Sequence, residues 1–117
     1  MLRQWFKERT LINSNDLVMK EQYFLVTFFD RRLKLPRIRT VVYIGKNIFK
    51  EEVKDKWYFQ DAELYLSEGI PKELSDAEDL GVLALGEDAL PLVETLDSLI
   101  EILGDVKEDK LRFKHKV

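Results

Sequence analysis

Cysteine is absent from the 117 residues, and histidine occurs once, as His115. Without a thiol the chain can form no disulfide, no thiolate nucleophile and no zinc–thiolate site. A serine–histidine pair would have to recruit His115, which lies in a lysine-rich segment of alternating polarity. The sequence therefore predicts no catalytic residue and favours a protein that is not an enzyme.

Long apolar runs are also missing, and the longest are as short as Val41-Val42-Tyr43-Ile44. A membrane span needs about 20 apolar residues. A signal peptide needs an apolar run of about 7–15 residues after its basic start, and none follows residues 1–9. We therefore expect a soluble, cytoplasmic protein without a membrane span. Three prolines and five glycines leave little linker, which favours a single domain over residues 1–117.

Motifs for metal or phosphate binding are not found. The acidic run Ser75-Asp76-Ala77-Glu78-Asp79 lacks the ligand offsets and the glycine of a calcium loop. Gly45, Gly81 and Gly86 lack the remainder of a phosphate-binding loop. The sequence therefore predicts no metal site and no cofactor.

Hydrophobic residues make up 45% of the chain and aromatic residues 11%, which is typical of a globular protein with a core. The net charge of −3 is unevenly distributed. Residues 1–60 hold 13 basic and 7 acidic side chains, residues 61–105 hold one and 13, and residues 106–117 hold 5 and 2. This distribution can give the protein surfaces of opposite sign.

Five segments have the pattern of strands. Residues 22–30 and 37–45 are rich in aromatic and β-branched residues, and the short loop between them predicts an antiparallel hairpin. Three aromatic residues open a third strand at 57–60. The apolar run between glycines at 81–86 predicts a buried strand, and the alternation at 110–116 makes a candidate edge strand.

Helix signals occur between and around these strands. Asp61 has the chemistry of an N-cap for a helix at 62–68, and Gly69 can end it. The spacing within Ser75-Asp76-Ala77-Glu78 fits a capping box. Apolar residues at helical spacing predict a further short helix at 2–12.

The clearest helix is predicted over residues 91–103, with Pro91 in its first turn and Gly104 as its stop. Its apolar stripe consists of Leu92, Leu96, Leu99, Ile100 and Leu103. Strands followed by mixed helices and strands predict an α+β fold. We expect a mainly antiparallel sheet of four to five strands with two to three helices packed on it.

The acidic stretch supplies the leading hypothesis for function. An acidic surface can steer and bind a basic partner, so we expect a protein–protein interaction module such as an adaptor, regulator or inhibitor. The candidate residues are Asp76, Glu78, Asp79, Glu87, Asp88, Glu94, Asp97 and Glu101. A further alternative is an enzyme that depends on carboxylates, which would need one of them buried in a pocket.

Two other features suggest partners. Trp57 and Tyr58 could anchor a protein interface if their rings are exposed. A basic hairpin with aromatic residues on its strands could bind single-stranded nucleic acid, although the acidic stretch would repel a polyanion. The basic residues are Arg31, Arg32, Lys34, Arg37 and Arg39. An unpaired final strand at 110–116 would also allow a homodimer.

Overall fold

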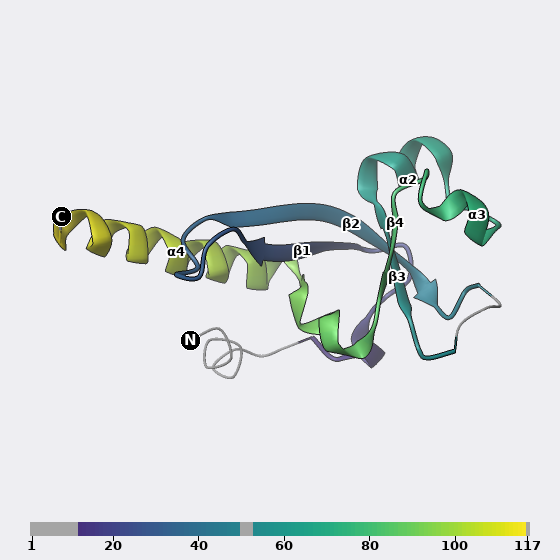
Figure 1. Cartoon of the computed structure of the whole chain (residues 1–117), viewed down its shortest axis with the longest axis horizontal. Coiled ribbons are helices and arrows are strands. Elements are labelled where there is room, and N and C mark those ends of the chain that lie inside the picture. The colour runs from purple at the N-terminus through teal and green to yellow at the C-terminus, as the bar shows by residue number, and fades with distance from the viewer. Residues whose placement is uncertain (1–11, 50–52, 117) are drawn as a thin grey trace.

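The computed structural model describes residues 12–49 and 53–116, and for 109–116 only the helical backbone. Its five strands form one antiparallel sheet in the order β4-β3-β2-β1-β5 (Figure 1). They are β1 (Gln22–Phe28), β2 (Pro36–Lys46), β3 (Trp57–Asp61), β4 (Val82–Leu85) and β5 (Val93–Glu94). The helices are α2 (Ala62–Glu68), α3 (Leu74–Ala77) and α4 (Leu96–Lys116), with 3₁₀ turns η1 (Ser14–Asp16) and η2 (Glu87–Leu92). The predicted α+β fold is confirmed.

Strand β2 is the longest strand and joins two halves of the sheet. Its first part, from Pro36 to Val42, pairs with β1, and its last part, from Val41 to Lys46, pairs with β3. Only Val41 and Val42 pair on both sides. The two halves are therefore staggered along β2, and the molecule measures 52 × 28 × 22 Å.

A bulge between Tyr43 and Gly45 shifts the register where β2 pairs with β3. Gly45 has a φ of 133°, and a Cβ there would lie 2.5 Å from Ile48 Cγ2. Glycine relieves both the positive φ and the close approach. The bulge therefore depends on this residue.

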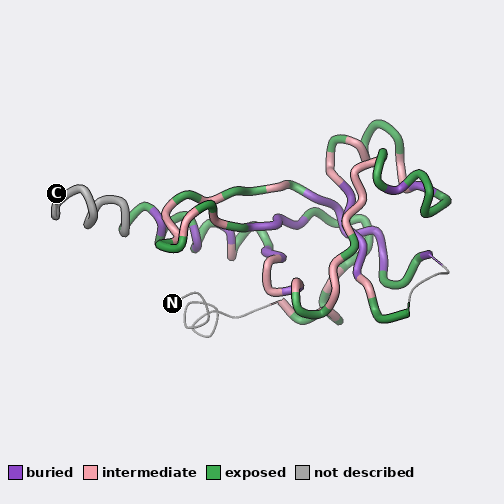
Figure 2. The backbone as a smooth tube through the Cα atoms, viewed as in Figure 1, coloured by how far each residue is buried: buried purple, intermediate pink, exposed green. Residues whose placement is uncertain are grey.

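The two faces of the sheet are covered differently. The face that carries Phe24, Val26, Val42 and Tyr58 packs against α4 at the β1 end and against the α2–α3 region at the β3 end; we call it the helix face. The opposite face, which we call the arginine face, packs with η2 and residues 12–17 around Tyr23, Val41 and Phe59. Figure 2 shows burial along β1 and at the strand crossing, whereas the first half of β2 is exposed or half-buried.

The hairpin of β1 and β2, strand β3 and helix α2 form where the sequence predicts them. The Asp61 carboxylate accepts hydrogen bonds from the backbone N–H groups of Glu63 and Leu64 at 3.0 and 3.2 Å. Helix α2 ends at Gly69, whose φ is 75°. Side chains within each segment produce these elements, so local patterns suffice to predict them.

The prediction for residues 81–86 was partly wrong. Strand β4 forms there, but it lies at the edge of the sheet and its residues are half-buried or exposed. No strand covers its outer side among the residues described. The predicted capping box at 75–78 was also wrong, because α3 begins at Leu74 after Glu73 and has no side-chain cap.

The predicted helix at 91–103 was wrong in its start and its end. Pro91 lies inside η2, β5 follows, and α4 begins at Leu96. The signal that the prediction missed is Thr95: its Oγ1 accepts from the Ser98 backbone N–H at 3.2 Å, while Ser98 Oγ accepts from the Thr95 backbone N–H at 2.8 Å. This reciprocal cap starts the helix.

Helix α4 continues through Gly104 to Lys116, so the predicted stop at Gly104 and the predicted strand at 110–116 were both wrong. The homodimer through that strand loses its basis as well. Among residues 96–108 of α4, the buried side chains are Leu99, Ile102 and Val106, whereas Leu96, Ile100 and Leu103 are exposed. The predicted helix at 2–12 lies almost wholly outside the described residues.

The orientation of α4 gives a matched pair of substitutions two residues apart. Ile102 is fully buried against β1, so Ile102→Ala should lower the free energy of unfolding by about 2–5 kcal/mol. Ile100 is exposed, so Ile100→Ala should change it by no more than about 0.5 kcal/mol. Urea titrations followed by tryptophan fluorescence measure both values. Equal losses, or a larger loss at Ile100, would contradict this orientation.

Candidate functional site

The outer surface of α4 carries two parallel rows of exposed side chains. One row, the acidic stripe, consists of Asp97, Glu101, Asp105 and Glu108. These residues follow one another three or four positions apart, so they lie along one side of the helix. None of them forms an ion pair with a described residue. Within the described part of the chain, no basic side chain neutralises the acidic stripe.

The second row, the apolar stripe, consists of Leu96, Ile100 and Leu103. Leu96 is 59% exposed and Ile100 60%. Its spacing of i, i+4 and i+7 is the one by which amphipathic helices dock into apolar grooves of partner proteins. The stripe lies about 90° round the helix from the buried Leu99, Ile102 and Val106. One apolar side of α4 is thus buried in the core, and a second apolar side is exposed.

The remaining acidic candidates are spread over the molecule. Asp76, Glu78 and Asp79 lie in and after α3, and Glu87 and Asp88 begin η2. Figure 1 shows α3 and α4 at opposite ends of the molecule. The predicted acidic residues therefore do not form one continuous face, and of them Asp97 and Glu101 belong to the acidic stripe of α4.

Glu94 cannot belong to an acidic surface, because it is only 4% exposed. It lies opposite Phe24 in the pairing of β5 with β1, on the side where α4 packs. Glu94 also makes an interaction within the structure. The prediction that Glu94 belongs to an acidic surface was wrong, because Glu94 is part of β5, a strand of the sheet that was not predicted.

Trp57 and Tyr58 are buried as well, so the predicted aromatic anchor is not available at the surface. Trp57 belongs to the core of the arginine face. Tyr58 belongs to the core of the helix face, where its ring meets that of Phe49 edge-on at 5.0 Å. Both sides of β3 are covered, which the sequence of β3 alone does not reveal.

The five basic residues of the hairpin are divided between two places. Arg31, Arg32 and Lys34 lie in the turn after β1, whereas Arg37 and Arg39 lie on β2. Arg37 is paired with Thr27 and Arg39 with Leu25, which places both on the arginine face. The turn and the sheet face are therefore separate basic surfaces.

Most aromatic rings of the hairpin cannot stack on bases. Tyr23, Phe24 and Tyr43 are buried in the core, and Phe28 is half-buried. Phe29 is the exception at 70% exposed. Binding of single-stranded nucleic acid by stacking needs several accessible rings. Most of the rings that the nucleic-acid-binding hypothesis requires are therefore not accessible.

A shallow groove of about 220 Å³ lies on the arginine face. Leu25, Leu83, Leu85 and Leu92 form its apolar lining, and Thr27, Arg37 and Arg39 complete it. We call it the arginine groove. Neither arginine forms an ion pair with a described residue, although Glu87 and Asp88 lie on the adjoining η2.

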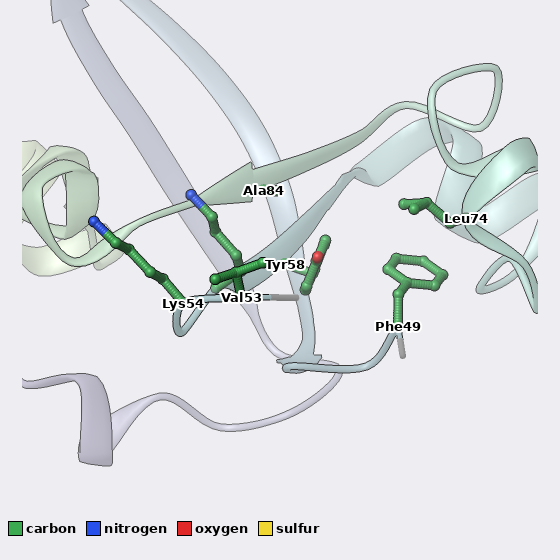
Figure 3. A pocket seen from close by; sticks show the side chains of 7 residues that line it. Phe49, Val53, Lys54, Tyr58, Leu74 and Ala84 are labelled. Atoms are coloured by element: carbon green, nitrogen blue, oxygen red, sulfur yellow. The ribbon is translucent and has the colours of Figure 1, made fainter. Parts of the chain in front are cut away.

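A second recess of about 390 Å³ lies between β3, β4 and α3. Figure 3 shows Phe49, Tyr58 and Leu74 gathered on one side, while the Lys54 side chain extends away from them. Among the described residues, no carboxylate lines this recess or the arginine groove. The described linings therefore contain no candidate for the buried acid of a carboxylate-dependent enzyme.

Within residues 12–49 and 53–116, no three histidine, aspartate or glutamate side chains are grouped as metal ligands. No helix in the described part of the chain is long and apolar enough to cross a membrane. Comparisons with models of protein families, with curated proteins and with solved structures find no match for this chain. Its function must therefore be argued from its own surfaces.

The hairpin turn is held by Asp30, which gives a test that depends on pH. Its Oδ1 accepts from the backbone N–H groups of Leu35 and Lys34 at 2.9 and 3.0 Å. Desolvation raises the pKa of Asp30, but backbone hydrogen bonds, with those from Leu35 and Lys34 the largest, outweigh it and leave the pKa below its ordinary value. The ionised carboxylate therefore stabilises the fold.

We expect Asp30→Ala to lower the melting temperature at pH 7, since the turn loses its acceptor. A carboxyl group whose pKa is lower in the folded than in the unfolded state stabilises the fold fully at pH values above its unfolded-state pKa of about 3.9. This stabilisation is lost as the pH falls through the folded-state pKa. The difference in melting temperature between wild type and Asp30→Ala should therefore disappear in strong acid. Thermal melts by circular dichroism measure it, with the exposed Asp79→Ala as control. A gap that does not change with pH would refute this role of the charge.

Proposed function

We propose that this protein is a non-catalytic protein–protein interaction module that docks on its partner through the outer surface of α4. One observation carries the proposal: α4 exposes the apolar stripe next to the acidic stripe, on a helix whose third side is already packed on β1. Exposed apolar rows rimmed by charge mark interaction sites. An adaptor, a regulator or an inhibitor could use such a surface.

The arrangement of the two stripes specifies the partner's chemistry. The partner must offer an apolar groove to Leu96, Ile100 and Leu103, because burial of these exposed side chains in such a groove removes apolar surface from water. The acidic stripe needs basic side chains along one rim of that groove. Complementary charge speeds encounter and sets the orientation of docking, while the buried apolar anchors supply most of the affinity.

This surface is better suited to docking than the predicted acidic set as a whole. Asp97 and Glu101 are one turn apart on α4, so a partner meets both at once. The acidic residues of α3 and η2 are remote from one another and lack a matching exposed apolar row at helical spacing. The proposal therefore keeps Asp97 and Glu101 from the predicted set and adds Asp105 and Glu108.

A site-specific photo-crosslink tests the proposal. A benzophenone amino acid replaces Ile100 in the full chain, which is irradiated in lysate of the native host and resolved by mass. We expect one discrete adduct. The same probe at Leu66 is the control, because Leu66 is also strongly exposed but lies on α2.

Charge reversal on α4 shows whether the adduct depends on this surface. Asp97→Lys combined with Glu101→Lys should reduce the adduct at least about tenfold, since the acidic stripe changes sign. Glu63→Lys with Glu68→Lys on α2 is the matched control and should leave it unchanged. Circular dichroism checks that both variants remain folded, because loss of an acid in the first turn of α4 costs only about 0.3–1 kcal/mol. No adduct at Ile100, or one insensitive to reversal, would overturn the proposal.

A further inference from the structure

The arginine groove has the chemistry that the outer surface of α4 requires of a partner. Leucine side chains line it, together with Arg37 and Arg39. At about 220 Å³ it is smaller than typical small-molecule pockets of about 300–1,000 Å³. It can instead receive one or two apolar side chains of a protein helix.

The spacing of charges matches as well. Arg37 and Arg39 are two residues apart on one face of β2, which places their Cα atoms about 6.7 Å apart. Asp97 and Glu101 are four residues apart on α4, which separates them by about 6 Å along the helix axis. Two guanidinium groups can therefore meet two carboxylates while Leu96 and Ile100 lie over the leucine lining. Arginine–carboxylate pairs are among the stronger charged hydrogen bonds.

A chain cannot place its own α4 in its own groove. Leu99, Ile102 and Val106 hold α4 on the helix face, against Phe24 and Val26. Leu25, Arg37 and Arg39 point to the other side of the same sheet. The sheet lies between the two surfaces, so a contact between them must join two molecules.

We propose that the partner of α4 is a second copy of this chain, whose arginine groove receives Leu96 and Ile100 while Arg37 and Arg39 bind Asp97 and Glu101. This inference rests on the proposed function, because it names the occupant of the same α4 surface. It brings oppositely charged side chains of the sequence together: Arg37 and Arg39 of β2 and the acidic stripe of α4 become the two sides of one interface. Self-association is therefore expected to weaken with salt.

Sedimentation equilibrium of the full chain tests the inference. We expect a weight-average mass that rises with concentration above the 13.9 kDa of one chain and falls when salt is added. Arg37→Glu with Arg39→Glu should weaken association at least about tenfold, and so should Asp97→Lys with Glu101→Lys. Arg31→Glu with Lys72→Glu is the control for the arginine variant, because it changes the net charge by the same amount at two exposed residues outside the groove.

Mixing the two charge-reversed variants gives the decisive result. In each variant alone, the groove and the outer surface of α4 carry charges of the same sign. In the mixture, the acidic groove of one variant can bind the lysines at positions 97 and 101 of the other. The mixture should associate about as strongly as wild type. A chain that stays at 13.9 kDa at all concentrations, or a mixture that does not recover, would overturn the inference.

The crosslink at Ile100 separates this outcome from the proposed function. An adduct of two copies of the chain, lost in Arg37→Glu with Arg39→Glu, supports the inference. A monomeric chain whose Ile100 adduct contains a different protein overturns the inference and leaves the proposed function in place. A monomeric chain with no adduct at Ile100 overturns both.

Discussion

Strand β2 is the element on which the rest of the structure depends. It pairs with β1 through its first part and with β3 through its last, and only Val41 and Val42 belong to both pairings. The two halves of the sheet are therefore displaced from each other along β2. Beyond this overlap, the bulge between Tyr43 and Gly45 shifts the register of β2 against β3.

The stagger decides which surfaces are covered and which are left open. Helix α4 reaches only the β1 half of the helix face, and α2 and α3 reach only the β3 half. On the other face, the core around Phe59 forms where the halves overlap, so Arg37 and Arg39 lie beyond it. The exposed stripes and the arginine groove are both consequences of this layout.

Elements with local signals could be predicted, and those that depend on neighbours could not. The carboxylate of Asp61 starts α2 whatever packs on it. Helix α4 has two rows of apolar residues at helical spacing, one of Leu96, Ile100 and Leu103 and the other of Leu99, Ile102 and Val106. The sequence does not determine which of the two rows packs against Phe24 and Val26 of β1. Of the candidate site, Asp97 and Glu101 were predicted, but the groove and the exposed apolar row were not.

The sequence by itself determined the hairpin, the aromatic third strand, helix α2 and the segregation of charge, because these follow from side chains close together in the chain. Only the tertiary structure decided that Trp57 and Glu94 are buried and that Leu96 and Ile100 are exposed. Burial depends on which element lies opposite each residue. That is set by the pairing of distant strands along β2, for which no local pattern exists.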